Sequence, residues 1–516
     1  MLIKIRKYDL DFSKTVFFLI IITITGFVIR INYLPDNIPL TLDALRYFLL
    51  GMDVSILGNL PEGYDKTNIG WPVFLAVIFQ FVRYEYFLDY MTLQRIISIS
   101  ISTITIIPVY LLLRRFFNYK YALLGSILFL FEPRMIQNSF LGITDSLFIL
   151  LTTTTLFLIL SSRIKIIYIA FAFAAFATMV RYEGVILLCL ISILYFIRYR
   201  KNKKELLKYT IAISIFILMI LPMSYARSNA TVSDGIGDAV LGGVQVYATE
   251  AISNQENILV GISSYILSGL QSFIKFFGWI MIPYFILFVP LGIFLMLKQK
   301  NENKIFIILS IIILSIPALY AYSRGIQETR YLYLLHPIFC VVSIFAIKFL
   351  EERIKKIIII IIIAVVVSSV VFLTIKDVDY EHEKEAFEIA KYVSKYTNSI
   401  NAYPPESKYV RVTGMIDEFP ILSNSVSFGP KIVEMRTYYG ESNYKSLIEF
   451  IEKNRNQGLD HLVLDGKNNR AIFFNDVFIN EKKYPYLTNI FDSSDMGYKY
   501  HVKIYKINYD KFDEYN

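Results

Sequence analysis

Four groups of acidic and basic residues stand beside long apolar stretches of this 516-residue chain. In chain order they are Asp43 with Arg46; Glu132, Arg134 and Asp145; Arg181 with Glu183; and Arg324 with Arg330. A carboxylate can take a proton from a reacting group, and an arginine can hold a phosphate through two parallel hydrogen bonds. These residue types therefore suit a reaction that activates a hydroxyl group and binds a phosphate.

Each group also has a purely structural interpretation. Asp43 and Asp145 stand where an aspartate would cap a helix. Arg181 and Glu183 could mark a tight turn between two helices, and the last two arginines could anchor the chain among tyrosines at a membrane interface. No group is specific by itself. Their common position at the ends of apolar stretches is the more informative observation, since ionisable groups at the edge of hydrocarbon are costly.

The composition predicts a polytopic membrane protein. Hydrophobic residues make up 55% of the chain and charged residues only 18%, and the mean hydropathy is +0.50. The net charge of +9 could indicate a nucleic-acid partner, but the basic residues cluster between apolar stretches, so no nucleic acid is expected. Cys189 and Cys340 lie within apolar stretches and predict neither a disulfide framework nor a zinc site.

The hydropathy pattern predicts about eleven transmembrane helices in residues 1–375. The expected spans are 15–32, 92–113, 121–133, 146–161, 166–180, 184–198, 209–225, 277–297, 304–321, 331–350 and 355–375. Alternate connections are rich in lysine and arginine, which places the N-terminus in the cytoplasm and residues 376–516 outside the cell membrane. The basic N-terminal segment precedes a retained first helix, because no small-residue cleavage site follows it.

Two long connections are expected on the outer side, at residues 33–91 and 226–276. The first contains the apolar stretch 70–82, which is short for a span and is interpreted as an interfacial or re-entrant helix. Beyond the spans, residues 376–516 alternate helical and strand patterns. Helices are expected at 379–396 and 446–460 and strands at 408–414, 461–466 and 500–509, which predicts a small soluble α/β domain.

Short motifs in a fixed order resemble a known superfamily over roughly residues 10–350. They are "LTLDALRYFLLGMDV", "GWPVFLAVI", "LLLRRFF", "FEPRMIQNSFLGITDSLF", "FATMVRYEGVILL" and "ETRYLYLLHPI". This series resembles the GT-C glycosyltransferases that use polyprenyl-phosphate sugars, such as the protein mannosyltransferases and the aminoarabinose transferases of lipid A. The Trp-Trp-Asp-Tyr-Gly signature of oligosaccharyltransferases is absent.

The resemblance implies roles for particular residues. It makes Asp43, in the first outer loop, an acidic residue of the reaction centre, and Asp145 the second outer-loop aspartate. It places Arg330 and Tyr331, with Arg324 nearby, against the phosphate of the lipid donor. Most protein mannosyltransferases have Asp-Glu at the first site, whereas Ala44 follows Asp43 here.

The expected activity is transfer of a sugar from a dolichyl or undecaprenyl phosphate to a hydroxyl of a protein, glycan or lipid acceptor, with inversion. Expected partners are thus the donor, the acceptor and membrane lipids. The chemistry requires no metal, although Asp43 with Asp145 could bind a divalent cation. Two other functions fit the residues: a transporter or flippase for lipid-linked sugars, and a membrane scaffold with an outer binding domain. A transporter should carry ionisable groups at mid-membrane depth, and the best such residue is His336.

Overall fold

The computed structural model describes residues 12–515, apart from 62–68, 85, 231–257, 300–303, 377, 397–399, 402–443, 457 and 468–470. The chain divides into two compact units. The first comprises Met1–Leu34, Tyr64–Trp71 and Arg95–Asp377, and the second Pro35–Gly63, Pro72–Gln94 and Val378–Asn516. The second unit therefore includes part of the predicted outer loop 33–91 together with the C-terminal region.

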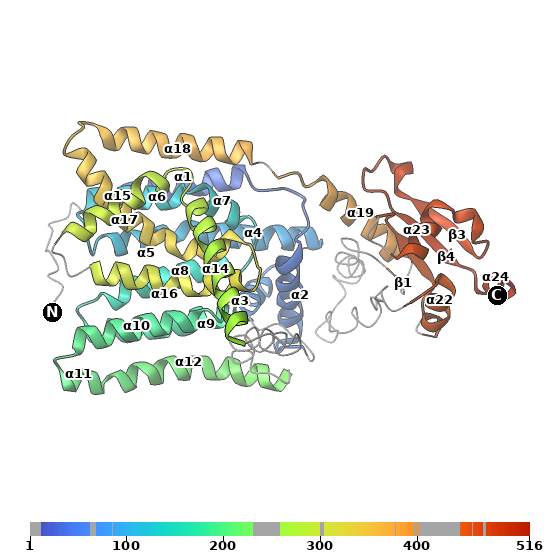
Figure 1. Cartoon of the computed structure of the whole chain (residues 1–516), viewed down its shortest axis with the longest axis horizontal. Helices are drawn as coiled ribbons and strands as arrows, with labels where there is room; N and C mark the ends of the chain where they lie inside the picture. The colour runs from blue at the N-terminus through green and yellow to red at the C-terminus, as the bar shows by residue number, and fades with distance from the viewer. Residues whose placement is uncertain are drawn as a thin grey trace. The chain divides into compact units, whose positions relative to one another are not determined.

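The first unit is built from apolar helices, many of which run roughly parallel (Figure 1). In chain order its elements are α1 (Phe12–Asn32), most of α4 (Phe87–Ile104), α5 (Ile106–Leu113), α6 (Tyr119–Leu130), α7 (Pro133–Ser139), α8 (Asp145–Ile159), α9 (Ile164–Val180), α10 (Gly184–Tyr199), α11 (Lys203–Leu207), α12 (Tyr209–Ala230), α14 (Ile258–Ile280), α15 (Phe285–Lys298), α16 (Lys304–Ser323), the 3-10 helix η1 (Thr329–Leu335), α17 (His336–Glu351) and α18 (Ile357–Ile375).

Helix length decides which of the predicted spans are long enough to cross a membrane by themselves. Within the described residues, six helical segments are long and apolar enough to cross a membrane, or seven if the pair α14–α15, bent by 107°, counts as one span. Each of the eleven predicted spans overlaps an apolar helix. However, α6, α8, α9 and α10 have only 12, 15, 17 and 16 residues, whereas a full crossing takes about 20. The chain is a multi-pass membrane protein.

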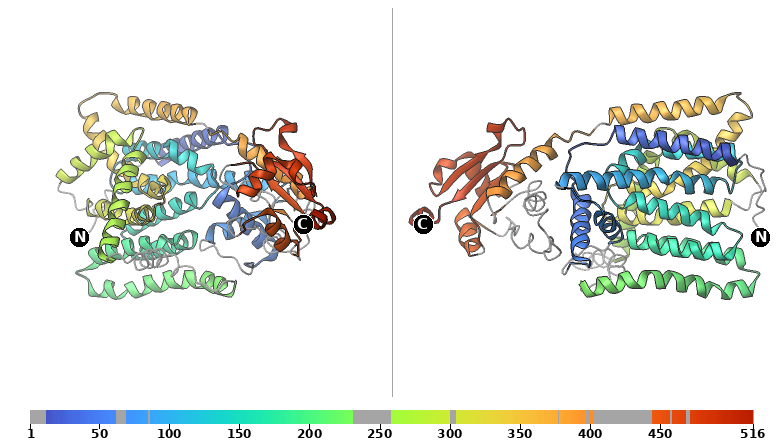
Figure 2. Two further views of the ribbon diagram at one scale, coloured as in Figure 1. Left: turned by 45° about the vertical axis from the view of Figure 1, so that its right-hand side comes forward. Right: turned by 180° about the vertical axis from the view of Figure 1, so that it is seen from behind.

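Burial separates a central helix from peripheral ones. In α17 every side chain from His336 to Ile347 is buried, while α1, α12 and α18 bury only 17%, 11% and 22% of their apolar windows. Their exposed faces carry isoleucine, leucine, valine and phenylalanine, as expected for surfaces that meet lipid. Seen from behind, α1 lies beside α18 (Figure 2), and Phe27 and Ile29 pack near Leu373.

The stretch predicted to be interfacial forms α3 (Gly70–Phe79), whose first two residues, Gly70 and Trp71, belong to the first unit. Trp71 is fully buried, and its indole N–H donates to the Gly142 carbonyl at 3.0 Å. A side chain at Gly70 would place its Cβ 2.6 Å from the backbone carbonyl of Met179, so only glycine permits this approach. The close approach of Gly70 to the Met179 backbone thus explains why a glycine begins α3.

Substituting Gly70→Ala should destabilise the protein by about 1–3 kcal/mol, because backbone must move to admit the methyl group. Gly278→Ala is the matched control, since a Cβ there would meet nothing within 4 Å. Thermal unfolding in detergent should show a lower midpoint for the first variant only. Equal midpoints for both variants would contradict the packing described here.

The second unit contains α2 (Leu42–Leu57), most of α3, the start of α4 and the C-terminal elements. The latter are α19 (Glu381–Tyr396), β1 (Ile400–Asn401), α22 (Leu447–Arg455), β2 (His461–Leu464), α23 (Ile472–Ile479), η3 (Glu481–Lys483), β3 (Leu487–Asp492), η4 (Ser493–Met496), β4 (Lys503–Ile507) and α24 (Tyr509–Tyr515). The sheet order is β1-β2-β4-β3, with β1 and β2 parallel and the other pairs antiparallel.

Several predicted C-terminal segments coincide with observed elements. The helices α19 and α22 and the strands β2 and β4 overlap their predicted ranges. The predicted strand 408–414 lies outside the described residues. Strand β3 and helix α23 were not predicted, and β3 has an irregular burial pattern interrupted by a register shift between Asn489 and Phe491. Such irregularity removes the alternation on which strand prediction depends.

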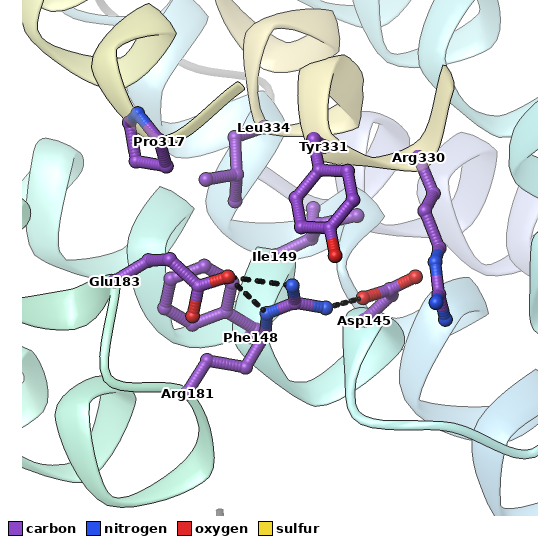
Figure 3. A pocket seen from close by; sticks show the side chains of 9 residues that line it. All are labelled: Asp145, Phe148, Ile149, Arg181, Glu183, Pro317, Arg330, Tyr331 and Leu334. Atoms are coloured by element: carbon purple, nitrogen blue, oxygen red, sulfur yellow. Dashed lines mark hydrogen bonds and ion pairs between the residues drawn. The ribbon is translucent and has the colours of Figure 1, made fainter. Parts of the chain in front are cut away.

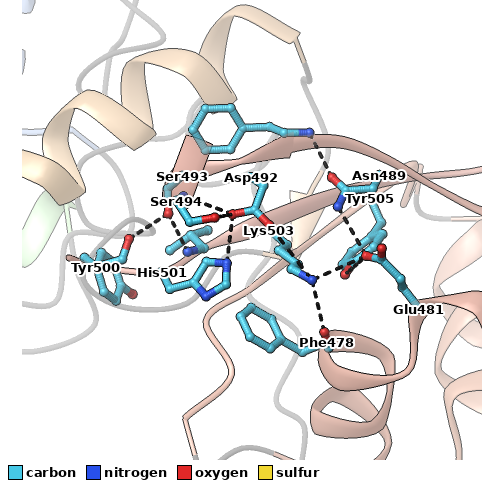
Figure 4. A network of polar contacts seen from close by, with 12 residues as sticks. Phe478, Glu481, Asn489, Asp492, Ser493, Ser494, Tyr500, His501, Lys503 and Tyr505 are labelled. Carbon is cyan, nitrogen blue, oxygen red and sulfur yellow. Dashed lines mark hydrogen bonds and ion pairs between the residues drawn. The ribbon is translucent and has the colours of Figure 1, made fainter. Parts of the chain in front are cut away.

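A polar network joins β3 to β4 (Figure 4). The Asp492 carboxylate accepts the Ser494 backbone N–H at 3.0 Å and lies 2.8 Å from His501 Nε2. Lys503 Nζ lies 3.9 Å from Asp492 and 3.4 Å from Glu481. Burial alone would raise the pKa of Asp492, but the Ser494 hydrogen bonds and the His501 charge lower it below its ordinary value. The network therefore holds an ionised carboxylate at the end of β3.

Candidate functional site

A pocket in the first unit gathers side chains from four separate segments (Figure 3). Its empty volume, including the open mouth, is about 290 Å³. It is lined by Asp145, Phe148, Ile149, Arg181, Glu183, Pro317, Arg330, Tyr331 and Leu334. Charged groups stand here against an apolar wall, which strengthens their electrostatic interactions.

Arg181 lies between two carboxylates in this pocket. Its guanidinium donates to Asp145 Oδ1 and, at 2.6 Å, to Glu183 Oε1. The side chains of Arg181, Asp145 and Glu183 are only 11%, 5% and 6% exposed. Burial alone would lower the pKa of Arg181, but the charges of Glu183 and Asp145 raise it well above its ordinary value. Arg181 thus stays a cation and fixes the direction of both acids.

Each acid of this cluster keeps a second oxygen without a hydrogen bond. Asp145 Oδ2 and Glu183 Oε2 are buried and have no partner in the described part of the chain. A buried acceptor left unsatisfied costs free energy. These two oxygens could therefore accept hydrogen bonds from hydroxyl groups of a bound ligand.

The opposite side of the pocket comes from η1. Arg330 is paired with Glu328 and extends alongside Asp145 (Figure 3). The Tyr331 ring stands between two guanidinium groups, 5.4 Å from that of Arg181 and 5.9 Å from that of Arg330. Such stacking limits the rotamers of both arginines. The pocket therefore presents two positioned cations beside one aspartate.

Local structure places these residues at helix ends. Asp145 begins α8 after Gly142, whose φ of 68° turns the chain in the left-handed region. Arg181 and Glu183 form the short connection between α9 and α10. The irregular η1 segment carries Arg330 and Tyr331 directly before the buried helix α17. Packing of α8 with α9, and of η1 with α8, brings the three segments together.

Removing the cation of this cluster should destabilise the fold. Arg181→Met removes the cation that pairs with both buried carboxylates and leaves Glu183 without its ion-pair partner, which should cost about 3–5 kcal/mol. Lys120→Met is the control, since Lys120 pairs with Glu351 while 52% exposed, and such surface pairs contribute about 0–1 kcal/mol. Thermal unfolding in detergent micelles measures both variants. An unchanged midpoint for Arg181→Met would show that the buried triad does not stabilise the fold.

The pocket unites five of the predicted site residues and leaves others elsewhere. Asp145, Arg181, Glu183, Arg330 and Tyr331 line it together. Arg324, predicted beside the donor phosphate, is exposed and stacks over Tyr320 at 5.7 Å; it does not line the pocket. The reason is the turn at Gly325, φ 77°, which separates it from η1.

Glu132 and Arg134 are buried but also do not line the pocket. Glu132 is the N-cap of α7 and accepts the backbone N–H of Arg134 at 3.3 Å. Its Oε1 atom also lies 3.8 Å from His336 Nε2. Glu132 therefore caps the N-terminus of α7.

Asp43 and Arg46 belong to the second unit. Asp43 is half-buried in the first turn of α2, behind the N-cap Thr41, and Arg46 is exposed. Gln94 Nε2 donates to the Ala44 carbonyl at 3.1 Å and ties this turn to the start of α4. The convergence of Asp43 with Arg330 stays a prediction, as does a divalent cation held by Asp43 and Asp145.

Sequence reasoning missed the apolar part of the pocket and one polar neighbour. Phe148 and Ile149 follow Asp145 by three and four residues, a spacing that puts them on its helix face. Pro317 and Leu334 come from α16 and η1 and had no local signal. Thr144 Oγ1 accepts from Arg181 at 3.4 Å. No group of three or more metal-ligating side chains occurs among the described residues.

Known proteins share both motifs and architecture with this chain. The family model of dolichyl-phosphate-mannose-protein mannosyltransferase matches residues 78–225. The archaeal oligosaccharyltransferase AglB from Archaeoglobus fulgidus, solved with an inhibitory peptide and a dolichol-phosphate, aligns over 89% of this chain and 70% of its own, with a TM-score of 0.54 and 12% identity.

ArnT from Cupriavidus metallidurans, solved with undecaprenyl phosphate, aligns over 82% of this chain and 74% of its own, with a TM-score of 0.53 and 13% identity. No curated protein matches by sequence. At such identities the structures establish the fold alone. The chain therefore has the fold of the GT-C superfamily of polyprenyl-phosphate-sugar-dependent glycosyltransferases, the superfamily that its motifs resemble.

Proposed function

We propose that this chain is a membrane glycosyltransferase that moves a sugar from a polyprenyl phosphate to an acceptor hydroxyl on the outer face of the cell membrane. The observation that supports the proposal most is the pocket of Asp145, Arg181, Glu183, Arg330 and Tyr331, set in a GT-C fold. Its charges suit a ligand that carries a phosphate and several hydroxyl groups.

The donor would be a sugar joined through phosphate to a long isoprenoid whose tail lies in the bilayer. AglB and ArnT were solved with dolichol-phosphate and undecaprenyl phosphate, respectively, which supports this class of lipid. Arg330 would contact the phosphate, since its side chain reaches the pocket beside Asp145. Tyr331 would keep this guanidinium and that of Arg181 in place.

The reaction would be a single displacement at the anomeric carbon. The acceptor oxygen forms the new bond, the bond to the phosphate oxygen breaks on the opposite face, and the anomeric configuration inverts. Asp43 would take the hydroxyl proton, and Arg330 would stabilise the charge that develops on the leaving phosphate. Asp145, directed by Arg181, would accept hydrogen bonds from the sugar. The acceptor would be a protein, a glycan or a lipid, and residues 376–516 would lie on its side of the membrane.

The test begins with the source cell. Deleting the gene and comparing surface glycoproteins and lipid-linked glycans by mass spectrometry should reveal a missing sugar on the acceptor and an accumulated lipid-linked donor. Purified protein in proteoliposomes should then transfer the sugar from this donor. A lipid-linked sugar that crosses the bilayer without transfer would instead indicate a flippase, and an unchanged glycan profile would favour a scaffold.

A further inference from the structure

Arg134 is a buried cation whose guanidinium makes no hydrogen bond in the part of the chain that the structure describes. Arg134 is only 8% exposed, and its Nε atom is buried without a hydrogen-bond partner among the described residues. What surrounds it is aromatic: the guanidinium lies 5.6 Å from the Trp279 ring centre and 5.1 Å from that of Phe372. Rings attract a cation through their faces, but they satisfy none of its five N–H donors.

Asn138 repeats the pattern one turn along α7. It is 4% exposed, and neither its amide nitrogen nor its amide oxygen has a hydrogen-bond partner among the described residues. Residues four apart lie on the same face of a helix. Arg134 and Asn138 therefore present an unsatisfied guanidinium and an unsatisfied amide side by side, as an anion with several oxygens would require.

The acid two residues before Arg134 forms no hydrogen bond or ion pair with its guanidinium among the described contacts. Glu132 accepts the backbone N–H of Arg134, not its side chain, and its Oε1 atom lies 3.8 Å from His336 Nε2. A buried charge without a counter-ion is destabilising. An anion from outside the described residues would compensate Arg134.

The position of α7 indicates where that anion comes from. Gln137 Nε2 donates to the Lys376 carbonyl at 3.2 Å, directly after the end of α18. Ser369 donates to the Phe131 carbonyl, so Ser369, Phe372 and Lys376 form one face of α18 toward α7. The end of a span lies at the level of lipid head groups, and Trp279 is 51% exposed there. Arg134 thus lies beside the end of α18 and does not line the reaction pocket.

We propose that Arg134 and Asn138, with Trp279 and Phe372 as side walls, form a binding site for the phosphate of an anionic membrane lipid, separate from the reaction pocket. The phosphate oxygens accept from the guanidinium and from the Asn138 amide nitrogen, while the acyl chains lie along the exposed apolar face of α18. Lys376, which is exposed at the same helix end, adds positive charge.

The experiment uses the full-length protein, delipidated in detergent. Phosphatidylglycerol should raise its unfolding temperature, and native mass spectrometry should detect one retained molecule. Diacylglycerol, which lacks the phosphate, should do neither. In Arg134→Met the apparent affinity for phosphatidylglycerol should fall about tenfold or more, as expected for loss of a charged hydrogen bond.

A control variant and a second variant of the site separate loss of lipid binding from general effects of the substitution. Arg353→Met also removes an arginine stacked on a phenylalanine, at 4.4 Å from Phe349, and should bind lipid as the wild type does. If Arg134→Met fails to fold, Asn138→Leu gives a second test of the same site. The proposal is overturned if phosphatidylglycerol and diacylglycerol act alike on the wild type, if folded variants bind as tightly as the wild type, or if inorganic phosphate alone reproduces the full stabilisation, which would indicate a free-anion site.

Discussion

Asp43→Asn should reduce the rate of sugar transfer about 10²- to 10⁴-fold, the usual loss when a general base is removed. The amide has nearly the shape of the carboxylate but cannot take a proton from the acceptor hydroxyl. The fold should survive, because Asp43 is half-buried in the first turn of α2 and Thr41, not Asp43, is the N-cap. Transfer in proteoliposomes, measured with saturating donor and acceptor, would report the loss as a lower kcat.

Asp36→Asn is the matched control, since Asp36 is an exposed carboxylate in the same connection and bonds only to Asn37 in the hydrogen bonds described. It should transfer sugar at the wild-type rate. Unaltered transfer by Asp43→Asn would remove the proposed base and leave Asp145 or Glu183 to take that role. Donor binding should be the same in all three proteins, because Asp43 acts on the acceptor.

Arg330→Met should lower kcat/KM for transfer about 10²- to 10³-fold, the range seen when one stabilising donor is removed from a transition state. Arg330 lines the pocket through η1 and lies beside Asp145. Its loss would leave the departing phosphate without its nearest cation. Arg330→Lys should recover only part of the rate, because an ammonium group lacks the planar fork that binds two phosphate oxygens.

Binding of polyprenyl phosphate, which carries the phosphate of the donor without the sugar, separates this effect from simple misfolding. A folded Arg330→Met protein should bind polyprenyl phosphate more weakly, as measured by displacement of a labelled lipid. Arg200→Met, which removes an exposed arginine after α10, is the control and should bind and transfer normally. Normal binding with normal transfer in Arg330→Met would place the donor phosphate elsewhere.

The two proposals depend on different sites. Arg134→Met tests the proposed lipid-binding site beside α18, whereas Arg330→Met tests the reaction pocket. Loss of phosphatidylglycerol binding with transfer retained would support the lipid site alone, and the converse would support the pocket alone. The two experiments therefore fail independently.

Local patterns were sufficient for much of the architecture. Each expected span overlaps an apolar helix, because an apolar segment in the bilayer must satisfy its own backbone hydrogen bonds, as a helix does. The strand β2 and the helices α19 and α22 were likewise visible in short-range periodicity. The irregular strand β3 was not, because a register shift interrupts its alternation.

The sequence by itself determined the class of this protein, the positions of its apolar helices and the residue types with which it could bind a lipid phosphate. Only the tertiary structure decided that Asp145, Arg181 and Arg330 share one pocket while Arg324 and Arg134 do not line it. The reason is physical: a span is specified by local hydrophobicity, but the neighbours of a charged side chain are specified by how distant helices pack. Arginines six residues apart, such as Arg324 and Arg330, can therefore look equivalent in the sequence and meet different surroundings in the fold.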